Sequence, residues 1–125
     1  MLMLLIVGTG GFFGTVFRYL LNVLIQKNSL LPSIPLGTLT VNVLGCFLIG
    51  FLGGLMEAKQ LLNQGLRLLL FIGFLGGFTT YSAFSYETFG FMKSGALLST
   101  LSNVGLHLFL GVGAVWIGTV LSNKI

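Results

Sequence analysis

One segment of this 125-residue chain, Gly73–Thr88 (GFLGGFTTYSAFSYET), combines polar side chains with the apolar character of a membrane span. It contains three glycines, three threonines, two serines, two tyrosines and a glutamate. Glycine costs a helix about 1 kcal/mol relative to alanine, and threonine also disfavours helix. Polar groups inside a bilayer are expensive and mark functional sites by default. The segment therefore predicts a functional site at a weak point of a membrane helix.

The polar residues within the apolar stretches are rich in neutral hydrogen-bond donors and poor in acids. They are Arg18, Asn42, Glu87, Asn103 and His107, with the hydroxyls of Thr38, Thr40, Thr79, Thr80, Ser82 and Ser85. The Asn42 amide can offer two N–H donors and each hydroxyl one, while Arg18 adds a fixed positive charge. Donors without nearby acids favour an anion as the ligand.

Aromatic side chains accompany these donors. Tyr81 and Phe84 are three residues apart and share a helix face, with Ser82 and Ser85 on the adjacent face. Ring edges carry partial positive charge and can add to an anion site. Alternatively, the rings only pack and the hydroxyls bond carbonyls one turn earlier. The spacing leaves both interpretations open.

Four weak helix formers, Gly76, Gly77, Thr79 and Thr80, lie near the middle of the third apolar stretch. Non-helical backbone at that depth is tolerated only where protein or water surrounds it. If two copies crossed antiparallel there, the freed carbonyls would converge and would suit a monovalent cation such as Na⁺. An unbroken helix whose glycines admit a neighbouring helix is the alternative, and the residues alone leave both open.

Helices must position these residues, because the composition excludes a soluble domain. The chain is 55% hydrophobic and 6% charged, whereas soluble domains carry about a quarter charged residues. We predict an all-α membrane protein, a single integral domain of residues 1–125 with four transmembrane helices of about 20 residues each. The spans are Leu2–Ile25, Leu36–Glu57, Leu66–Phe91 and Gly95–Leu121. The N-terminus lacks the basic region of a cleavable signal peptide, so we expect it to remain as the first helix.

The basic residues define almost no preferred orientation across the membrane. Lys59, Arg67 and Lys124 fall on one side, and Lys27 and Lys93 on the other. Such a chain can insert both ways and pair as an antiparallel dimer, although a weak bias that yields one orientation is the alternative. The scattered basic residues form no nucleic-acid patch.

Small residues recur at four-residue spacing and predict closely packed helices. The pairs are Gly10/Gly14, Gly50/Gly54, Gly73/Gly77 and Ala114/Gly118. Cys46, the single cysteine, excludes an internal disulfide and is expected to be a small packing residue.

Three motifs in order give the chain a family resemblance. GGFFGTVFRY (Gly10–Tyr19) resembles a first-helix motif with its arginine, and PLGTLTVNVLGCFLIG (Pro35–Gly50) resembles a second-helix motif with its asparagine. GFLGGFTTYSAFS (Gly73–Ser85) resembles a third-helix motif, usually written GFxGGxTTFSTFS. Over nearly its whole length, the chain resembles the Fluc/CrcB family of fluoride channels.

The resemblance implies passive, highly selective export of cytoplasmic fluoride, which reduces fluoride toxicity. Hydrogen fluoride enters from acidic surroundings, dissociates inside, and the trapped anion leaves by the channel. The implied assembly is a dual-topology dimer with two antiparallel pores in the lipid of a prokaryotic plasma membrane. A structural Na⁺ at the dimer centre would be held by the backbone carbonyls of the broken third helix, from Gly76 and Thr79.

The resemblance also implies which residues line the pore. The pore asparagine would be Asn42, and the two pore aromatics would be Tyr81 and Phe84. Arg18 and Glu87 match family positions to which we assign supporting roles. The remaining expected lining residues are Ser82, Ser85, Asn103 and His107.

Two departures from the family pattern stand out. Tyr81 occupies a position where the family usually has phenylalanine, which keeps the ring edge and adds a hydroxyl. Asn103 and His107 stand where relatives commonly show tyrosine and serine along a polar track. Some family members form heterodimers with one degenerate pore, so a paired homologue is an alternative partner to a second copy of this chain.

Other function classes fit the residues less well. A small multidrug-resistance-like exporter also has four spans and dual topology, but it needs an acid in its first helix, and Leu2–Ile25 contains none. A non-transporting accessory protein would not need the set of Asn42, Tyr81 and Phe84. An enzyme would need paired carboxylates, a nucleophile with its base or a metal cluster, and none is apparent. His107 has only Cys46 as a soft companion, so we reject transition-metal transport.

Overall fold

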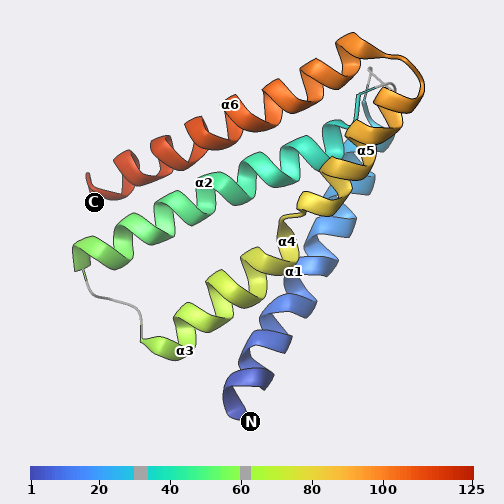
Figure 1. Ribbon diagram of the computed structural model, residues 1–125. Helices are drawn as coiled ribbons and strands as arrows, with labels where there is room; N and C mark the ends of the chain where they lie inside the picture. The colour runs from blue at the N-terminus through green and yellow to red at the C-terminus, as the bar shows by residue number, and fades with distance from the viewer. Residues whose placement is uncertain (30–33, 60–62) are drawn as a thin grey trace.

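The computed structural model describes residues 1–29, 34–59 and 63–125, and these residues form helices and no strands (Figure 1). The helices are α1 (Leu2–Lys27), α2 (Leu36–Lys59), α3 (Gln64–Arg67), the π-helical segment η1 (Leu68–Leu75), α4 (Gly76–Phe78), α5 (Tyr81–Lys93) and α6 (Leu97–Ser122). Residues 30–33 and 60–62, which belong to two of the connections between the predicted spans, lie outside the described residues.

Four segments are long and apolar enough to cross a bilayer. They are Leu2–Lys27, Leu36–Glu57, Gln64–Lys93 and Leu97–Ser122, with mean hydropathies of 1.5, 2.0, 1.5 and 1.9. At a rise of about 1.5 Å per residue, even the shortest reaches the roughly 30 Å of a hydrocarbon core. The predicted all-α class with four long apolar helices is confirmed.

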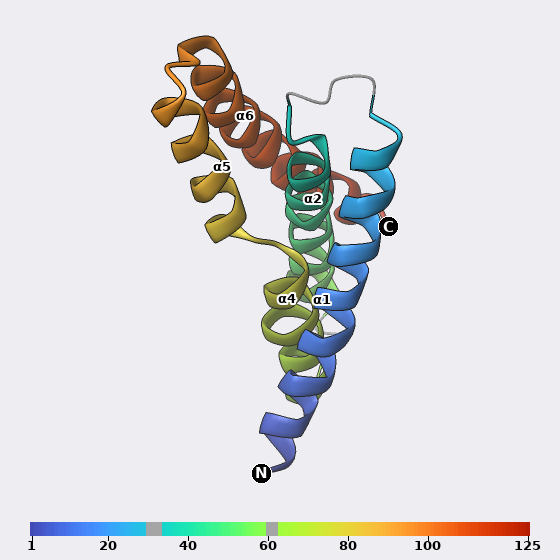
Figure 2. The same ribbon diagram turned by 90° about the vertical axis from the view of Figure 1, so that its right-hand side faces the viewer.

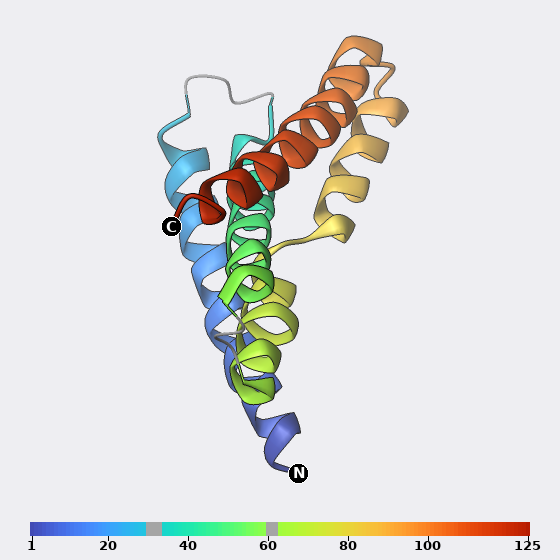
Figure 3. The same cartoon turned by 90° about the vertical axis from the view of Figure 1, so that its left-hand side faces the viewer.

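The third segment changes its packing partner along its length. Its first half, η1 and α4, packs on α1, whereas its second half, α5, packs on α6. Figure 2 shows α1 beside α4 and, farther along the molecule, α5 beside α6. A short extended stretch between α4 and α5 makes this change possible (Figure 3).

Small residues set the distance between the packed helices, as their spacing predicted. A Cβ at Gly14 of α1 would meet the backbone of Phe74 and Phe78. A Cβ at Gly50 of α2 would likewise meet the backbone of Val115 on α6. Close backbone approach of this kind drives helix association in lipid, where there is no hydrophobic force between helices.

Most of the apolar surface of the single chain is uncovered. Large side chains such as Phe12, Phe109 and Trp116 are 65%, 77% and 67% exposed. Among the described residues, the buried apolar side chains are few, namely Leu39, Val41, Leu75, Phe78 and Ala114. A surface of this kind fits a protein whose solvent is lipid.

Candidate functional site

The third helix is interrupted at two threonines, as the family resemblance implied, whereas the residues alone leave an unbroken helix open. Thr79 (φ −85°, ψ 155°) and Thr80 (φ −147°, ψ 117°) are extended, so the helix ends at Phe78 and restarts at Tyr81. β-Branched threonine suits this backbone, and both threonines also satisfy helix ends with their side chains. The Thr79 hydroxyl donates to the Leu75 carbonyl (2.9 Å), while the Thr80 hydroxyl accepts from the Ala83 N–H (3.2 Å).

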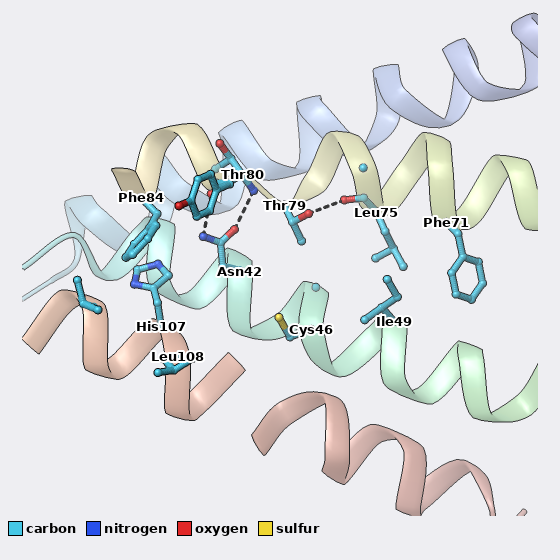
Figure 4. Close-up of a pocket in the computed structure, with 14 residues that line it drawn as sticks. Asn42, Cys46, Ile49, Phe71, Leu75, Thr79, Thr80, Phe84, His107 and Leu108 are labelled. Carbon is cyan, nitrogen blue, oxygen red and sulfur yellow. Dashed lines mark hydrogen bonds between the residues drawn. The ribbon is translucent and has the colours of Figure 1, made fainter. Parts of the chain in front are cut away.

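Asn42 of α2 holds the extended backbone of Thr80 with two hydrogen bonds (Figure 4). Its Nδ2 donates to the Thr80 carbonyl (3.0 Å), and its Oδ1 accepts from the Thr80 N–H (2.8 Å). Unpaired backbone groups are costly at membrane depth, so this amide stabilises the interruption. The second N–H of Asn42 has no hydrogen-bond partner within the described residues, and it is therefore available to a ligand.

The interruption leaves two oppositely polarised helix ends near each other. The final carbonyls of the Gly76–Thr79 turn lose their helical N–H partners, and the first N–H groups of α5 lose their carbonyls. A helix N-terminus attracts anions, and a helix C-terminus attracts cations. With 13 residues, α5 is long enough for its N-terminus to contribute to an anion site.

A pocket of about 560 Å³ lies beside the interruption, between α2, the third segment and α6. Its lining residues are Asn42, Gly45, Cys46, Ile49, Phe71, Leu75, Gly76, Thr79, Thr80, Tyr81, Phe84, Val104, His107 and Leu108. Six of the predicted site residues are brought together here: Asn42, Gly76, Thr79, Tyr81, Phe84 and His107. No carboxylate is among these lining residues.

Three rings lie in sequence along one side of the pocket. The centroids of Tyr81 and Phe84 are 5.7 Å apart, and those of Phe84 and His107 are 4.5 Å apart. Phe84 is partly buried between the other two, whereas Tyr81 is 79% exposed in the single chain. Tilted ring pairs of this kind leave ring edges, which are weakly positive, available to a neighbouring anion.

The predicted residues outside the pocket lining are Arg18, Ser82, Ser85, Glu87 and Asn103. The exposed hydroxyl of Ser82 lies 3.2 Å from that of Thr80. Within the described part of the chain, Arg18 and Ser85 have no side-chain hydrogen bond or ion pair, although Arg18 is only partly exposed.

Asn103 is buried and connects α6 to α5. Its Nδ2 donates to the Thr88 hydroxyl (2.9 Å), which in turn donates to the Phe84 carbonyl (2.7 Å). One turn later, Nδ1 of His107 lies 2.9 Å from the Asn103 carbonyl. The hydrogen bond between Asn103 and Thr88 joins α6 to α5 one turn away from His107 and from Phe84. It therefore holds the two rings in a defined orientation relative to each other.

A second polar connection runs from α1 through α2 to α5. Asn22 Nδ2 donates to the Thr38 hydroxyl (3.4 Å), and that hydroxyl donates to Oε1 of Glu87 (2.5 Å). The other carboxylate oxygen of Glu87 is buried without a hydrogen-bond partner in the described residues. Sequence reasoning missed Asn22, although its position four residues after Arg18 places both on one face of α1.

Polar side chains one turn apart on α2 therefore hold α5 at two places. Asn42 pairs with Thr80 at the start of α5, and Thr38 pairs with Glu87 two turns into it. The sequence shows a hydroxyl and an amide four residues apart, but it does not show which residues they contact. The same helix face thus serves both to line the pocket and to orient the helix opposite.

Comparison with known proteins agrees with this architecture. The family model described as CrcB-like protein, Camphor Resistance (CrcB), matches residues 5–119. A protein of Dehalococcoides mccartyi named fluoride-specific ion channel FluC is 44% identical over 122 residues, which cover 98% of this chain and 93% of the relative. A channel of the same name from Nitratidesulfovibrio vulgaris is 40% identical, with 92% of each chain covered.

A third relative, fluoride-specific ion channel FluC 1 of Methanosarcina acetivorans, is 41% identical over 94% of this chain and 88% of its own length. These relatives are named as ion channels, which agrees with the prediction that the chain is not an enzyme. The resemblance found in the three helix motifs is confirmed. The chain is a multi-pass membrane protein that belongs to the CrcB-like protein family.

Proposed function

We propose that this protein is a fluoride-selective ion channel through which cytoplasmic fluoride leaves the cell by passive electrodiffusion. The observation that carries the proposal is the pocket beside the interrupted helix, which combines amide and aromatic groups with no carboxylate in its lining. The names of the relatives support fluoride as the ion. Such export lowers fluoride toxicity, because fluoride that enters as the neutral acid is trapped inside as the anion.

The groups that line the pocket suit an anion that accepts strong hydrogen bonds. Fluoride is a small, strongly hydrated ion, so it must exchange water for other donors on its way. The free N–H of Asn42, the first N–H groups of α5 and the ring edges of Tyr81 and Phe84 are such donors. A larger, more weakly hydrogen-bonding halide gains less from them, which accounts for selectivity. Arg18 and Glu87 are assigned supporting roles outside the lining.

The remaining predicted pore residues extend this path along α5 and α6. Ser82 lies at the start of α5 and is exposed, and its hydroxyl can donate to an entering ion. Ser85 has no side-chain hydrogen bond within the described residues, so its hydroxyl is also available. Asn103 is buried and bonded to Thr88, and its role in the path is to hold α6 against Phe84 and to position His107.

The working assembly in this proposal is an antiparallel dimer with two pores. The exposed apolar faces of the helices and the nearly even distribution of basic residues support a partner of opposite orientation. The partner is a second copy of this chain or, alternatively, a paired homologue. The membrane in which it resides is proposed to be a prokaryotic plasma membrane.

A structural Na⁺ fits the backbone of the interruption. Thr79 is extended and Gly76 is exposed on the pocket, and the carbonyls of this turn lack helical partners. Neutral carbonyl oxygens at the negative end of a helix suit a monovalent cation. Gly76 and Thr79 of each copy would hold the ion, which would neutralise the two helix ends where the copies meet.

The test of the proposed function is ion efflux from liposomes that contain the purified protein. With an ionophore to dissipate the membrane voltage, we expect rapid release of fluoride and retention of chloride. Protein-free liposomes report leakage of the neutral acid. Equal release of both halides would contradict the selectivity, and no release from folded protein would contradict the channel function.

A further inference from the structure

The imidazole of His107 has one ring nitrogen that is buried and unpartnered. Its Nε2 has no hydrogen-bond partner among the described residues, although the residue lines the pocket. Buried polar atoms in folded proteins are nearly always paired, so each exception requires an explanation. A ligand or a water molecule bound to Nε2 would supply the missing partner.

The hydrogen bond of the other ring nitrogen, Nδ1, determines which tautomer the neutral imidazole of His107 adopts. Nδ1 lies 2.9 Å from the Asn103 carbonyl, and a carbonyl oxygen can only accept. Nδ1 therefore carries the proton, and in the neutral ring Nε2 is left with a lone pair. A lone pair repels an anion, whereas a protonated Nε2 would donate a hydrogen bond and add a positive charge.

The location of His107 makes this difference relevant to an ion in the pocket. Its ring lies 4.5 Å from that of Phe84 between centroids, and Figure 4 shows the two rings side by side at one end of the pocket. Asn103 supports both residues, because its side chain donates to Thr88 of α5 and its carbonyl lies 2.9 Å from Nδ1 of His107 on α6. A change in the protonation of Nε2 therefore affects the part of the pocket lining where the edges of aromatic rings are available to an ion.

No other titratable group near α6 makes a hydrogen bond to Nε2 of His107 within the described residues. The two helices that pack on this side of α6 are α2 and α5. They bring Cys46 and Tyr81 to the pocket lining and Glu87 to the contact with α2, while Tyr86 is largely exposed. None of these side chains makes a hydrogen bond to His107 in the described part of the chain, and the remaining charged residues of α2 and α5 lie at the helix ends.

We propose that His107 binds fluoride through Nε2–H when the imidazole is protonated, and that this makes fluoride flux increase at acidic pH. The inference rests on the proposed function and adds a proton-dependent ligand to it. Imidazole is the side chain whose charge changes near neutral pH. The channel would then conduct fluoride fastest under the acidic conditions in which hydrogen fluoride enters a cell.

The first test uses the fact that His107 is the only histidine of the chain. Histidine-specific ¹⁵N labelling of the full chain, purified without a histidine tag, gives NMR signals from this ring alone. At about pH 8 we expect a proton on Nδ1 and none on Nε2. Fluoride at about ten times its dissociation constant should raise the titration midpoint by about one pH unit, because it binds only the protonated ring. A proton on Nε2 of the neutral ring, or a midpoint unaffected by fluoride, would overturn the inference.

The second test measures fluoride efflux from liposomes at about pH 8 and about pH 6, with protein-free liposomes as the control at each pH. We expect the wild-type flux to be at least about threefold greater at the lower pH. His107→Gln keeps an N–H donor that does not titrate, so its flux should be the same at both values. Cys46→Ser and Glu87→Gln, which remove the neighbouring titratable groups, should retain the pH response.

The outcomes of the flux test separate this inference from the proposed function. Fluoride-selective flux that is independent of pH, or a pH response that survives in His107→Gln, overturns the role of His107 and leaves the channel function standing. A response lost in Glu87→Gln but kept in His107→Gln assigns it to the carboxylate and also overturns the inference. Absence of flux from the folded wild-type protein at both values overturns the channel function and this inference together.

Discussion

Asn42 and Thr80, 38 residues apart in the chain, exchange two hydrogen bonds of 3.0 and 2.8 Å at the interruption of the third helix. One side-chain amide thereby replaces the backbone partners that a continuous helix would have provided. It also retains one N–H for the pocket. Binding and backbone support therefore depend on the same side chain.

Asn42→Asp tests this double role. An aspartate still accepts from the Thr80 N–H, but its second oxygen faces the Thr80 carbonyl and its negative charge repels an anion. We expect fluoride flux to fall at least about tenfold, since an unpaired buried group costs about 1–3 kcal/mol. Liposome efflux measures the effect, and Thr40→Ser, on the same helix, is the control. Wild-type flux in Asn42→Asp would remove Asn42 from the pore.

Phe84→Ile tests the contribution of the ring edge. Isoleucine fills much of the same space but offers no positively polarised edge, so we expect about a tenfold loss of fluoride flux. Tyr81→Phe keeps the edge and removes only a hydroxyl, so its flux should remain within about threefold of wild type. Fluoride efflux is measured for both variants. If the two variants had equal flux, ring edges would not be the ligands.

Thr38→Val removes the hydroxyl that donates to Oε1 of Glu87 without a large change in shape. Since one oxygen of Glu87 already has no partner within the described residues, we expect a loss of about 1–3 kcal/mol of stability, measured by thermal unfolding in detergent. Thr40→Val is the matched control, because Thr40 makes no side-chain hydrogen bond within the described residues. Equal losses in the two variants would show that the contact with Glu87 contributes nothing.

Gly14→Ala tests the close contact between α1 and the third segment. A Cβ there would meet the backbone of Phe74 and Phe78, which can shift less readily than the end of a flexible side chain. We expect clear destabilisation and a lower yield of folded protein. Gly8→Ala has open space around the added methyl group and should be neutral or stabilising by up to about 1 kcal/mol. Thermal unfolding compares the two, and a stabilised Gly14→Ala would contradict the packing.

Replacing Na⁺ in the buffer tests the proposed ion at Gly76 and Thr79. An ion that binds only the folded assembly should stabilise it by about 2.7 kcal/mol at a hundred times its dissociation constant. We therefore expect a higher unfolding temperature in Na⁺ than in N-methylglucamine of equal ionic strength. Thr79→Ser keeps the carbonyl and a hydroxyl for Leu75, so it should retain the response. Unfolding temperatures that do not depend on the cation would argue against the site.

The membrane character, the four apolar spans and the weak helix formers in the third span follow from the order of the amino acids alone. Apolar runs of the required length predict spans because hydropathy is a property of each local window. Glycine and threonine disfavour helix wherever they occur, so they mark a place where a break can form. The residues alone leave an unbroken helix open there, and only the family resemblance implied the break at Thr79 and Thr80. The three helix motifs likewise depend on local order and spacing, so they indicated the family before any contact was known.

Which polar groups meet, in contrast, depends on how the helices pack in the folded chain. The partners Thr38 and Glu87 are 49 residues apart, and nothing near either residue specifies the other. Nor did any local pattern indicate that the third segment changes its packing from α1 to α6 at its interruption. In lipid, the close fit of small residues and the pairing of polar groups determine which helices pack together. Both are properties of two surfaces in contact, and one segment of sequence describes only one of those surfaces.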